Sequence, residues 1–329
     1  MNIKILGMAK QLPRTVVSSR DLDDRTGQPY GSIEKSTGVS SRHWVADDET
    51  VTSLGSAAFM RALGQASLDL REIDLLITAG AAFDMAVPHG SVLLKAALPD
   101  LEPDFPCFHV HSTCLSFLNA LDVAHAMLES GRHCTIAIVC AEISSPMLTH
   151  TDPKTYGLFG DAGVAMIIQR SDVGGYVCRG SRFENYPAGA ELARLRIGGR
   201  SNRGRTSDPD DRGYFFEMES HAIIRATLDP LEPFLQKLQS QTGCSIHEMD
   251  AAVCHQTSKF GNTYMQRRYG LNEEQFIDTL HDHGNCISAS IPLGLEKLYS
   301  SGPLEGKRVM LLGSGAGVSL GGMVLEFSH

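Results

Sequence analysis

A cysteine, a histidine and an asparagine stand where predicted strands end in this sequence, and these residue types can do nucleophilic and proton-transfer chemistry. Cys114 follows the apolar stretch at residues 105–110 and precedes leucines at helical spacing, which predicts a strand running into a helix with the thiol between them. Backbone N–H groups and the helix dipole favour the thiolate there, and Ser112 and Thr113 are typical capping residues. Most unpaired cysteines are small core residues, so Cys114 alone does not establish a nucleophile.

His255 and Asn285 supply the other two groups. His255 follows the apolar run 249–254, and Asn285 follows Gly284 after a short strand predicted over 276–280. An imidazole transfers protons near neutral pH, and a carboxamide donates hydrogen bonds without titrating. A lone histidine is more often a satisfied core or surface residue, and an asparagine after glycine is often part of a turn. Brought together, the three groups would suit nucleophilic catalysis with proton transfer.

The segments that carry these residues occur twice along the chain. IDLLITAG (73–80) matches MDAAVCHQ (249–256), the strand before Cys114 matches the strand before Asn285, CTIAIVC matches RVMLLGS, and FGDAGVAMII matches GSGAGVSLGGMVLEF. We therefore predict two similar βαβ-rich halves, residues 1–170 with the cysteine and residues 215–329 with the histidine and asparagine. Ligands gather beyond the carboxyl ends of parallel strands, so Cys114, His255 and Asn285 are expected to converge there.

Residues 171–214, between the halves, differ from both halves in composition. They are rich in glycine and arginine with little apolar periodicity, which predicts a surface excursion or lid. Within residues 181–213 of this segment the arginines are Arg182, Arg194, Arg196, Arg200, Arg203, Arg205 and Arg212. Elsewhere, helices are predicted over 19–26, 53–68, 92–97, 222–238, 259–269 and 291–299, with Pro230 and Pro233 interrupting the fourth.

Composition and charge argue against several classes of protein. The net charge of -9 disfavours nucleic-acid binding. The eight cysteines form no C-x-x-C pair, which indicates reduced thiols. The histidine pairs at 109/111 and 281/283 lack a third ligand at metal-binding spacing and are expected to be structural, so no metal is predicted. No apolar stretch reaches the length of a membrane span or a signal-peptide core, so a cytoplasmic protein is expected.

Taken in order, the motifs resemble the β-ketoacyl-acyl-carrier-protein synthase III group of the thiolase superfamily. The resemblance covers nearly the whole chain and rests on Cys114 at a strand-to-helix turn, His255-Gln256-Thr257-Ser258, Gly284-Asn285 with Ser288-Ala289-Ser290-Ile291-Pro292, Gly160-Asp161-Ala162-Gly163 and the glycine-rich turn 313–317. It implies an α/β fold of the thiolase-like duplicated kind, layered αβαβα with two pseudo-equivalent halves. It also implies a homodimer.

The resemblance further implies a reaction. Cys114 would hold the acyl group, and backbone N–H groups of Cys114, Gly315 and Ala316 would form the oxyanion hole. His255 Nε2 and Asn285 Nδ2 would donate to the enolate of a malonyl or β-ketoacyl thioester in a Claisen condensation, decarboxylative or not, in fatty-acid or specialised-metabolite synthesis. The substrates would be phosphopantetheine thioesters on acyl-carrier protein or coenzyme A, with no permanently bound cofactor.

Two departures from the family bear on the substrate. Members primed by coenzyme A sandwich its adenine between an aromatic residue and an arginine, where this chain has Ser32 and Ser36. The expected donor is therefore an acyl-carrier protein, or coenzyme A bound differently. The family places a bulky phenylalanine where this chain has Val87, beside Met85, which predicts an acyl pocket open to chains that are longer than acetyl, branched or functionalised.

A cationic helix is the predicted docking site for the carrier. Lys259, Arg267 and Arg268 lie on the helix predicted over 259–269 and would attract an acidic partner, with a strongly salt-dependent rate.

Two other functions stay open. The acyl group could pass to a hydroxyl or amine acceptor, or the chain could be a non-catalytic partner subunit. The retained cysteine, histidine and asparagine favour carbon–carbon bond formation over both.

Overall fold

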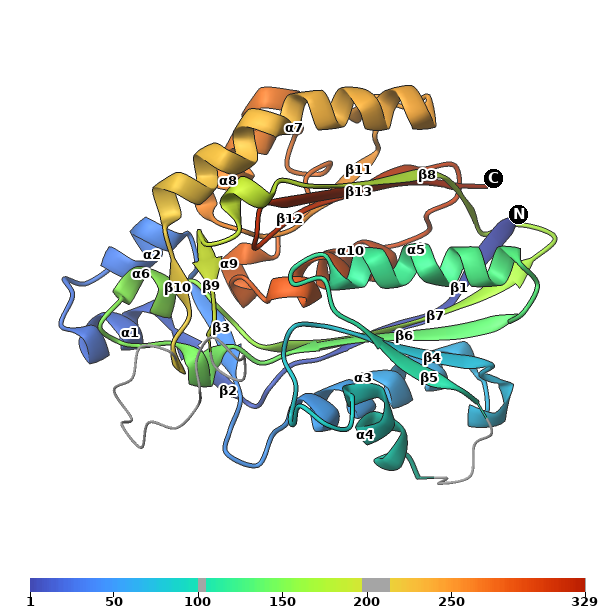
Figure 1. Ribbon diagram of the computed structural model, residues 1–329, viewed down its shortest axis with the longest axis horizontal. Coiled ribbons are helices and arrows are strands. Elements are labelled where there is room, and N and C mark those ends of the chain that lie inside the picture. Colours follow the sequence, from blue (N-terminus) through green and yellow to red (C-terminus); the bar gives the residue numbers. More distant parts are fainter. Residues whose placement is uncertain (100–104, 197–213, 329) are drawn as a thin grey trace.

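The first half of the chain builds one sheet of the computed structural model, which describes residues 1–99, 105–196 and 214–328 (Figure 1). The strand order is β5-β4-β6-β7-β1. β4 runs parallel to β5 and β6, while β7 runs antiparallel to β6 and β1. The strands are β1 (Asn2–Gln11), β4 (Leu75–Ala79), β5 (Cys107–Val110), β6 (Thr135–Glu142) and β7 (Ala162–Ser171).

The second half repeats this plan in the order β11-β12-β13-β8. β11 runs parallel to β12, and β13 runs antiparallel to both β12 and β8. The strands are β8 (Tyr176–Asn185), β11 (Ala251–Cys254), β12 (Arg308–Gly315) and β13 (Ser319–Phe327). A single residue pair, Ile3 with Tyr176, joins β1 to β8 and so connects the two sheets. The predicted duplication is therefore confirmed in strand order and direction.

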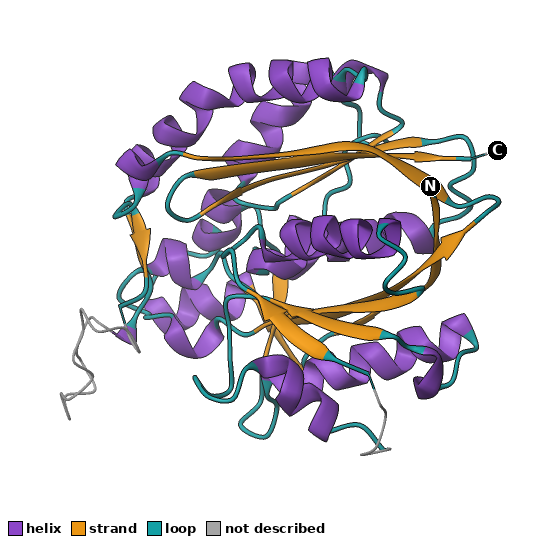
Figure 2. Ribbon diagram, turned by 45° about the vertical axis from the view of Figure 1, so that its right-hand side comes forward, coloured by secondary structure: helices purple, strands orange, loops and turns teal. Residues whose placement is uncertain are grey.

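Helices lie between the sheets and on both outer faces (Figures 1 and 2). α5 (Ser116–Glu129) and α10 (Ser290–Ser300) pack between them, α3 (Val51–Ala66) and α4 (Gly90–Ala96) cover the first sheet, and α7 (Ser220–Thr242) and α8 (Lys259–Tyr269) cover the second. Because helices cover both of its faces, the first sheet buries every residue of β4 and β6. The predicted αβαβα layering is confirmed. None of the described helices combines the length and apolarity needed to cross a bilayer.

Short elements gather at the left of Figure 1, near one end of the layers. They are β2 (Thr15–Ser18), α1 (Ser19–Thr26), α2 (Ser32–Thr37), β3 (Ser41–Trp44), α6 (Pro153–Tyr156), β9 (Ala193–Arg194), β10 (Glu217–Met218) and α9 (Leu280–His283). Single 3-10 turns occur at Leu70–Glu72, Ser145–Met147, Pro187–Gly189, Ile246–Glu248 and, as η6, at Ile287–Ala289.

The excursion predicted over 171–214 is wrong for its first part, because Tyr176–Asn185 forms β8 inside the joined sheet. The charged side chains of this strand obscure the apolar alternation by which a strand is predicted from sequence. Arg182 pairs with Glu184, and Arg179 with Glu326, so the strand keeps its cations paired near the surface. Further along, Arg194 and Arg196 both pair with Glu217, whereas residues 197–213, with the four remaining arginines of the predicted lid, lie outside the described residues.

Two other local predictions are also wrong. α7 continues through Pro230 and Pro233, because its buried face, including Phe234, packs against β8 and β13 and outweighs the interruptions. The strand predicted over 276–280 shrinks to one bridge between Phe276 and Ala252. Asp278 then accepts a hydrogen bond from the N–H of Leu280, at the first residue of α9, which ends the extended segment.

Candidate active site

Cys114 lies in the turn between β5 and α5, as predicted, but the turn is not capped as predicted. Leu115 is the N-cap of α5 and makes no side-chain cap bond, so neither Ser112 nor Thr113 caps the helix. Ser116 holds the turn instead: its Oγ accepts from the N–H of Ser112 at 2.9 Å and donates to the carbonyl of Thr113 at 2.6 Å. Thr113 has a φ of 50°, a left-handed conformation that reverses the chain just before the thiol.

The expected resting thiolate is contradicted. Burial raises the pKa of Cys114 to about 12, and the negative charge of Glu142 adds to this, while the N–H groups of Ala316 and of Cys114 itself lower it. The thiol is therefore protonated near neutral pH, and the donors at the helix start do not activate it alone. Attack on a thioester requires a base.

The turn at 313–317 lies directly against Cys114. The N–H of Ala316 reaches the Cys114 sulfur, and the N–H of Cys114 itself reaches it as well. Gly315 permits this approach, because a Cβ there would lie 2.9 Å from Thr113 Oγ1. Gly315 itself pairs with Ser319 in the β12–β13 ladder. The structure thus brings all three predicted oxyanion-hole residues together, with Ala316 and Cys114 as the donors that contact the sulfur.

His255 follows the last residue of β11 and is buried. Its Nδ1 lies 2.8 Å from the carbonyl oxygen of Ser314, and its Nε2 lies 3.2 Å from Asn285 Oδ1. Both partners are carbonyl oxygens, which only accept, so the neutral ring can donate to one of them. With the proton on Nδ1, toward the shorter contact at Ser314, Nε2 keeps a free lone pair and makes no hydrogen bond to Asn285 Oδ1. Burial lowers the pKa of His255 to about 4, so the ring is neutral near pH 7 and can accept a proton at Nε2.

Asn285 is held on both its backbone and its side chain. Its N–H donates to the carbonyl of Leu158 at 2.9 Å, and its carbonyl accepts from the N–H of Gly160 at 3.1 Å. A Cβ at Gly160 would lie 2.1 Å from the carbonyl oxygen of His283, so only glycine allows the Asn285 segment to come this close. Oδ1 of Asn285 accepts from the N–H of Ile287 at 2.9 Å, which leaves Nδ2 as the side-chain donor. The predicted convergence of His255 and Asn285 is thus observed.

Three neutral histidines predict acid destabilisation. Burial lowers the pKa of His125, His255 and His283 from 6.5 to about 4 in the folded chain. Between these pH values the unfolded state binds more protons, so the free energy of unfolding should fall as the pH falls, by up to about 4 kcal/mol per pH unit. Urea unfolding at a series of pH values measures this slope. His125→Gln should reduce it and the exposed-site control His247→Gln should not; equal slopes in all three proteins would contradict the assignment.

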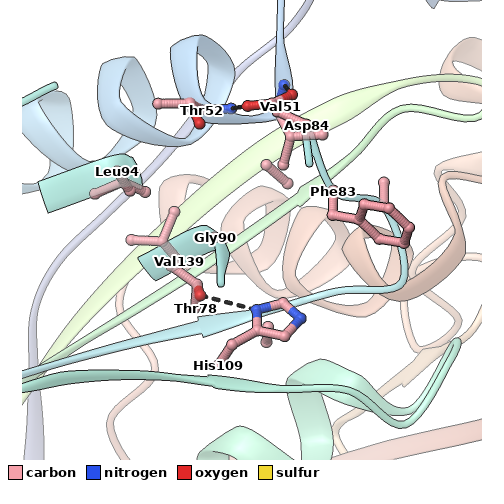
Figure 3. Close-up of a pocket in the computed structure, with 12 residues that line it drawn as sticks. Val51, Thr52, Thr78, Phe83, Asp84, Gly90, Leu94, His109 and Val139 are labelled. Carbon is pink, nitrogen blue, oxygen red and sulfur yellow. Dashed lines mark hydrogen bonds between the residues drawn. The ribbon is translucent and has the colours of Figure 1, made fainter. Parts of the chain in front are cut away.

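The histidines at the end of β5 make hydrogen-bond contacts with the neighbouring strand and the loop that follows it. His109 Nδ1 lies 2.9 Å from Thr78 Oγ1, and His111 Nδ1 lies 2.9 Å from the carbonyl oxygen of Gly80. No group of side chains in the described ranges has the arrangement of a metal site. Figure 3 shows His109 beside a cavity of about 20 Å³, where Asp84 accepts hydrogen bonds from two N–H groups at the start of α3. Asp84 therefore ties the loop after β4 to α3.

The predicted acyl-pocket residues lie on this loop and face outward. Val87 is 84% exposed and Met85 is 47% exposed. Neither lines the cavity of Figure 3 or a second, open cavity of about 400 Å³ bordered by Phe83, Ile143 and Met147. Neither residue therefore lines either of these two cavities. Their role in an acyl pocket stays a prediction.

The two positions that lack the adenine-binding side chains of the family lie close to the predicted docking helix α8. Ser32 and Ser36 lie on α2, and Gly38, directly after it, packs against the stem of Lys259 at the start of α8. An aromatic residue with an arginine does occur nearby: the Arg20 guanidinium lies 5.1 Å from the ring centre of exposed Tyr30.

The three predicted docking cations differ in their surroundings. Lys259 and Arg267 are exposed, whereas the Arg268 guanidinium lies 3.4 Å from a carboxylate oxygen of Glu232. α8 thus presents Lys259 and Arg267 to solvent, with Arg268 partly neutralised.

Sequence reasoning missed Glu142 and Ser314. Glu142 ends the apolar run of β6, at the carboxyl end that also carries the other site residues, and this position was an available signal. Ser314 acts through its backbone carbonyl, which orients His255, and a backbone contact of this kind leaves no trace in residue type.

Comparisons with known proteins agree with this geometry. Residues 108–186 match the family model for 3-oxoacyl-[acyl-carrier-protein] synthase III, and residues 239–327 match the model for its C-terminal part. The chain is 28% identical to the β-ketoacyl-[acyl-carrier-protein] synthase III of Neisseria gonorrhoeae, over 98% of this chain and 99% of the relative. It is 29% identical to the enzyme of the same name from Neisseria meningitidis serogroup B, with the same coverage.

Solved structures show the same fold. A priming β-ketosynthase of a polyketide pathway superposes with a TM-score of 0.87 at 26% identity, over 99% of this chain and 96% of that one. The 3-oxoacyl-[acyl-carrier-protein] synthase III of Aquifex aeolicus gives 0.87 at 23% identity, over 98% and 99% of the two chains. OleA of Xanthomonas campestris gives 0.86 at 20% identity, over 99% and 98%. The chain therefore belongs to the β-ketoacyl-[acyl-carrier-protein] synthase III family of condensing enzymes, within the thiolase superfamily.

Proposed function

We propose that this enzyme joins an acyl group held on Cys114 to a malonyl thioester by decarboxylative Claisen condensation. The observation that carries the proposal is the approach of His255 to Asn285, whose Nε2 and Oδ1 atoms lie 3.2 Å apart. Both residues lie at the same ends of the sheets as Cys114, whose sulfur contacts the N–H of Ala316. A nucleophile, a neutral base and a non-titrating donor are the groups that the two half-reactions need.

In the first half-reaction Cys114 attacks the acyl thioester. His255 Nε2 takes the thiol proton, since its lone pair is free and Nδ1 already donates to Ser314. The N–H groups of Cys114 and Ala316 stabilise the oxyanion that forms. The proton then passes from His255 to the departing thiolate of the donor, so the acyl-enzyme is left with a neutral ring.

In the second half-reaction the malonyl thioester loses carbon dioxide and its enolate attacks the acyl group on Cys114. Asn285 Nδ2 donates to the enolate oxygen in every protonation state. His255 donates from Nε2 only when protonated, and the negative charge of the malonyl group and enolate favours that form. The proton taken up by His255 ends on the Cys114 sulfur as the product leaves.

The acyl donor is proposed to be an acyl-carrier protein, because α2 offers serines at the positions where an adenine would stack. The enzyme is further proposed to work as a cytoplasmic homodimer, paired along the outer edge of β5. β5 ends the strand order, and edge strands have unpaired backbone groups.

Reversing two charges on α8 should weaken use of the carrier. For Lys259→Glu with Arg267→Glu, we expect the KM for acyl-carrier protein at low salt to rise by up to about tenfold, because long-range attraction is lost. The KM for a small pantetheine thioester should not change. Steady-state kinetics at several salt concentrations measure both, with Arg132→Glu at the far end of α5 as control. A carrier KM insensitive to salt and to both substitutions would contradict docking at α8.

A larger side chain at position 87 should restrict the acyl chain. Val87→Phe is expected to slow acylation by octanoyl thioesters about tenfold relative to acetyl, because the added ring would fill acyl-chain volume in the dimer. Acylation rates for a series of chain lengths test this. Val16→Phe, at another exposed valine, is the control. Val87 does not set the acyl chain length if the wild-type enzyme already prefers acetyl thioesters. The same conclusion follows if the ratio of octanoyl to acetyl acylation rates is equal in wild type and Val87→Phe.

Mass spectrometry tests the function itself. Incubation with acyl thioesters should add one acyl group, mapped to the peptide containing Cys114. Malonyl-carrier protein should then remove that group with release of carbon dioxide and formation of a β-ketoacyl product. Loss of the acyl group to a hydroxyl or amine without carbon dioxide would instead favour the acyltransferase, and failure to load Cys114 would favour a non-catalytic subunit.

A further inference from the structure

A buried carboxylate lies beside the candidate catalytic residues and has no part in the two half-reactions. Glu142 is the last residue of β6 and is completely buried. A buried carboxylate is strongly destabilising unless its oxygens are satisfied, so its retention calls for a physical reason.

Uncharged donors surround both oxygens of Glu142 within the described residues. Oε1 accepts from the N–H of Ala81 at 2.8 Å and from the hydroxyl of Ser288, and Oε2 accepts from the N–H of Ala82 at 2.9 Å. The N–H of Ser288 is a further donor to this group. Burial raises the pKa of Glu142 above its usual value, and the donors offset this only in part. A set made of donors nevertheless fits a carboxylate rather than a carboxyl group.

Through these bonds Glu142 joins the two halves of the fold. Its own strand and the turn at Ala81 and Ala82 belong to the first half, whereas Ser288 lies in η6, in the second. The Ser288 hydroxyl also lies 3.0 Å from the sulfur of Cys140 on β6. The Glu142–Ser288 contact is therefore one of the links that hold η6 against the first sheet.

η6 in turn fixes Asn285. The N–H of Ile287, the first residue of η6, donates to Asn285 Oδ1 at 2.9 Å, and the same oxygen faces His255 Nε2. A shift of η6 would therefore move the carboxamide that the condensation step uses.

We propose that Glu142 is a positioning residue: through Ser288 it holds η6 so that Asn285 keeps its place against His255 during condensation. Acylation of Cys114 does not use the Asn285 donor, so the role is specific to the second half-reaction. This inference rests on the proposed function.

Two substitutions test the contact from its two sides. Glu142→Gln and Ser288→Ala should each lower the kcat of condensation by about 10- to 100-fold, the effect of losing a hydrogen bond to a charged group. The KM for the malonyl thioester and the rate of Cys114 acylation should stay near wild type. Glu296→Gln is the matched control, because Glu296 is also a buried glutamate but bonds to Lys10, at 2.7 Å.

The pH dependence of Cys114 alkylation separates the loss of the Glu142 charge from the loss of the Glu142–Ser288 contact. The charge of Glu142 helps to raise the pKa of Cys114, so Glu142→Gln should shift iodoacetamide labelling toward lower pH, while Ser288→Ala keeps the charge and the profile. Peptide mapping is required, because Cys140 and Cys286 lie near the same carboxylate.

Each outcome decides the proposal. Condensation at the wild-type rate in folded Glu142→Gln and Ser288→Ala would overturn it, as would equal loss of acylation and condensation in both. If Glu142→Gln does not fold, Ser288→Ala alone decides. A wild-type enzyme that loads Cys114 but never condenses would refute the proposed function instead, and the labelling profile would still report whether Glu142 is charged.

Discussion

A protein carrying Cys114→Ser should form no acyl-enzyme on the minute scale, and its condensation rate should fall by a factor of about 10³ or more. Serine matches cysteine in size, so the turn held by Ser116 and the approach of Ala316 should persist. What changes is the nucleophile, since an alcohol is harder to deprotonate and a poorer attacking group than a thiol. Intact-protein mass spectrometry and a condensation assay measure both losses.

Cys114→Ala adds a second, diagnostic outcome. His255 and Asn285 remain in place, so malonyl decarboxylation should be impaired less than condensation, because the enolate donors do not depend on the sulfur. Cys134→Ser, at an exposed cysteine, is the control and should behave as wild type. An acyl adduct that persists on Cys114→Ala, mapped to another cysteine, would show that the nucleophile has been misassigned.

The placement of Cys114 and His255 could be predicted because each follows an apolar strand that forms in the structure, whereas the strand predicted before Asn285 does not form. Cys114 follows an apolar strand and precedes a helix, and His255 directly follows β11, the strand of the second half that matches β4. Internal repetition then placed both at the same sheet ends, which the strand order confirms. These features depend on hydrophobic periodicity and chain topology, both of which are readable from one sequence.

The chemical state of the site could not be predicted in this way. Position at a helix start suggested a thiolate, but the protonation of Cys114 is decided by burial and by the charge of Glu142, which is distant from it in the sequence. The tautomer of His255 depends on a single backbone carbonyl, that of Ser314. β8 was missed for a related reason, because its arginines obscure the apolar alternation and their partner carboxylates, such as Glu326, are distant in sequence.

Removing the base should slow both half-reactions and change their dependence on pH. For His255→Ala we expect Cys114 acylation at neutral pH to fall by about 10²- to 10⁴-fold, the usual size of a general-base contribution. In wild type, acylation should decline only as the pH falls through about 4, because burial lowers the pKa of His255 to about 4 and the base is neutral above it. This acid limb should be absent from His255→Ala.

Asn285→Ala and added imidazole distinguish a base from a structural histidine. Asn285→Ala should retain most acylation and lose condensation, because its Nδ2 serves only the enolate, whereas His255→Ala should lose both. Free imidazole should partly restore acylation in His255→Ala, since it can occupy the space of the ring and accept the thiol proton. His247→Ala, at an exposed ring on the second half, should change neither step. If His255→Ala acylates Cys114 at the wild-type rate, another group takes the thiol proton and His255 acts on the enolate alone.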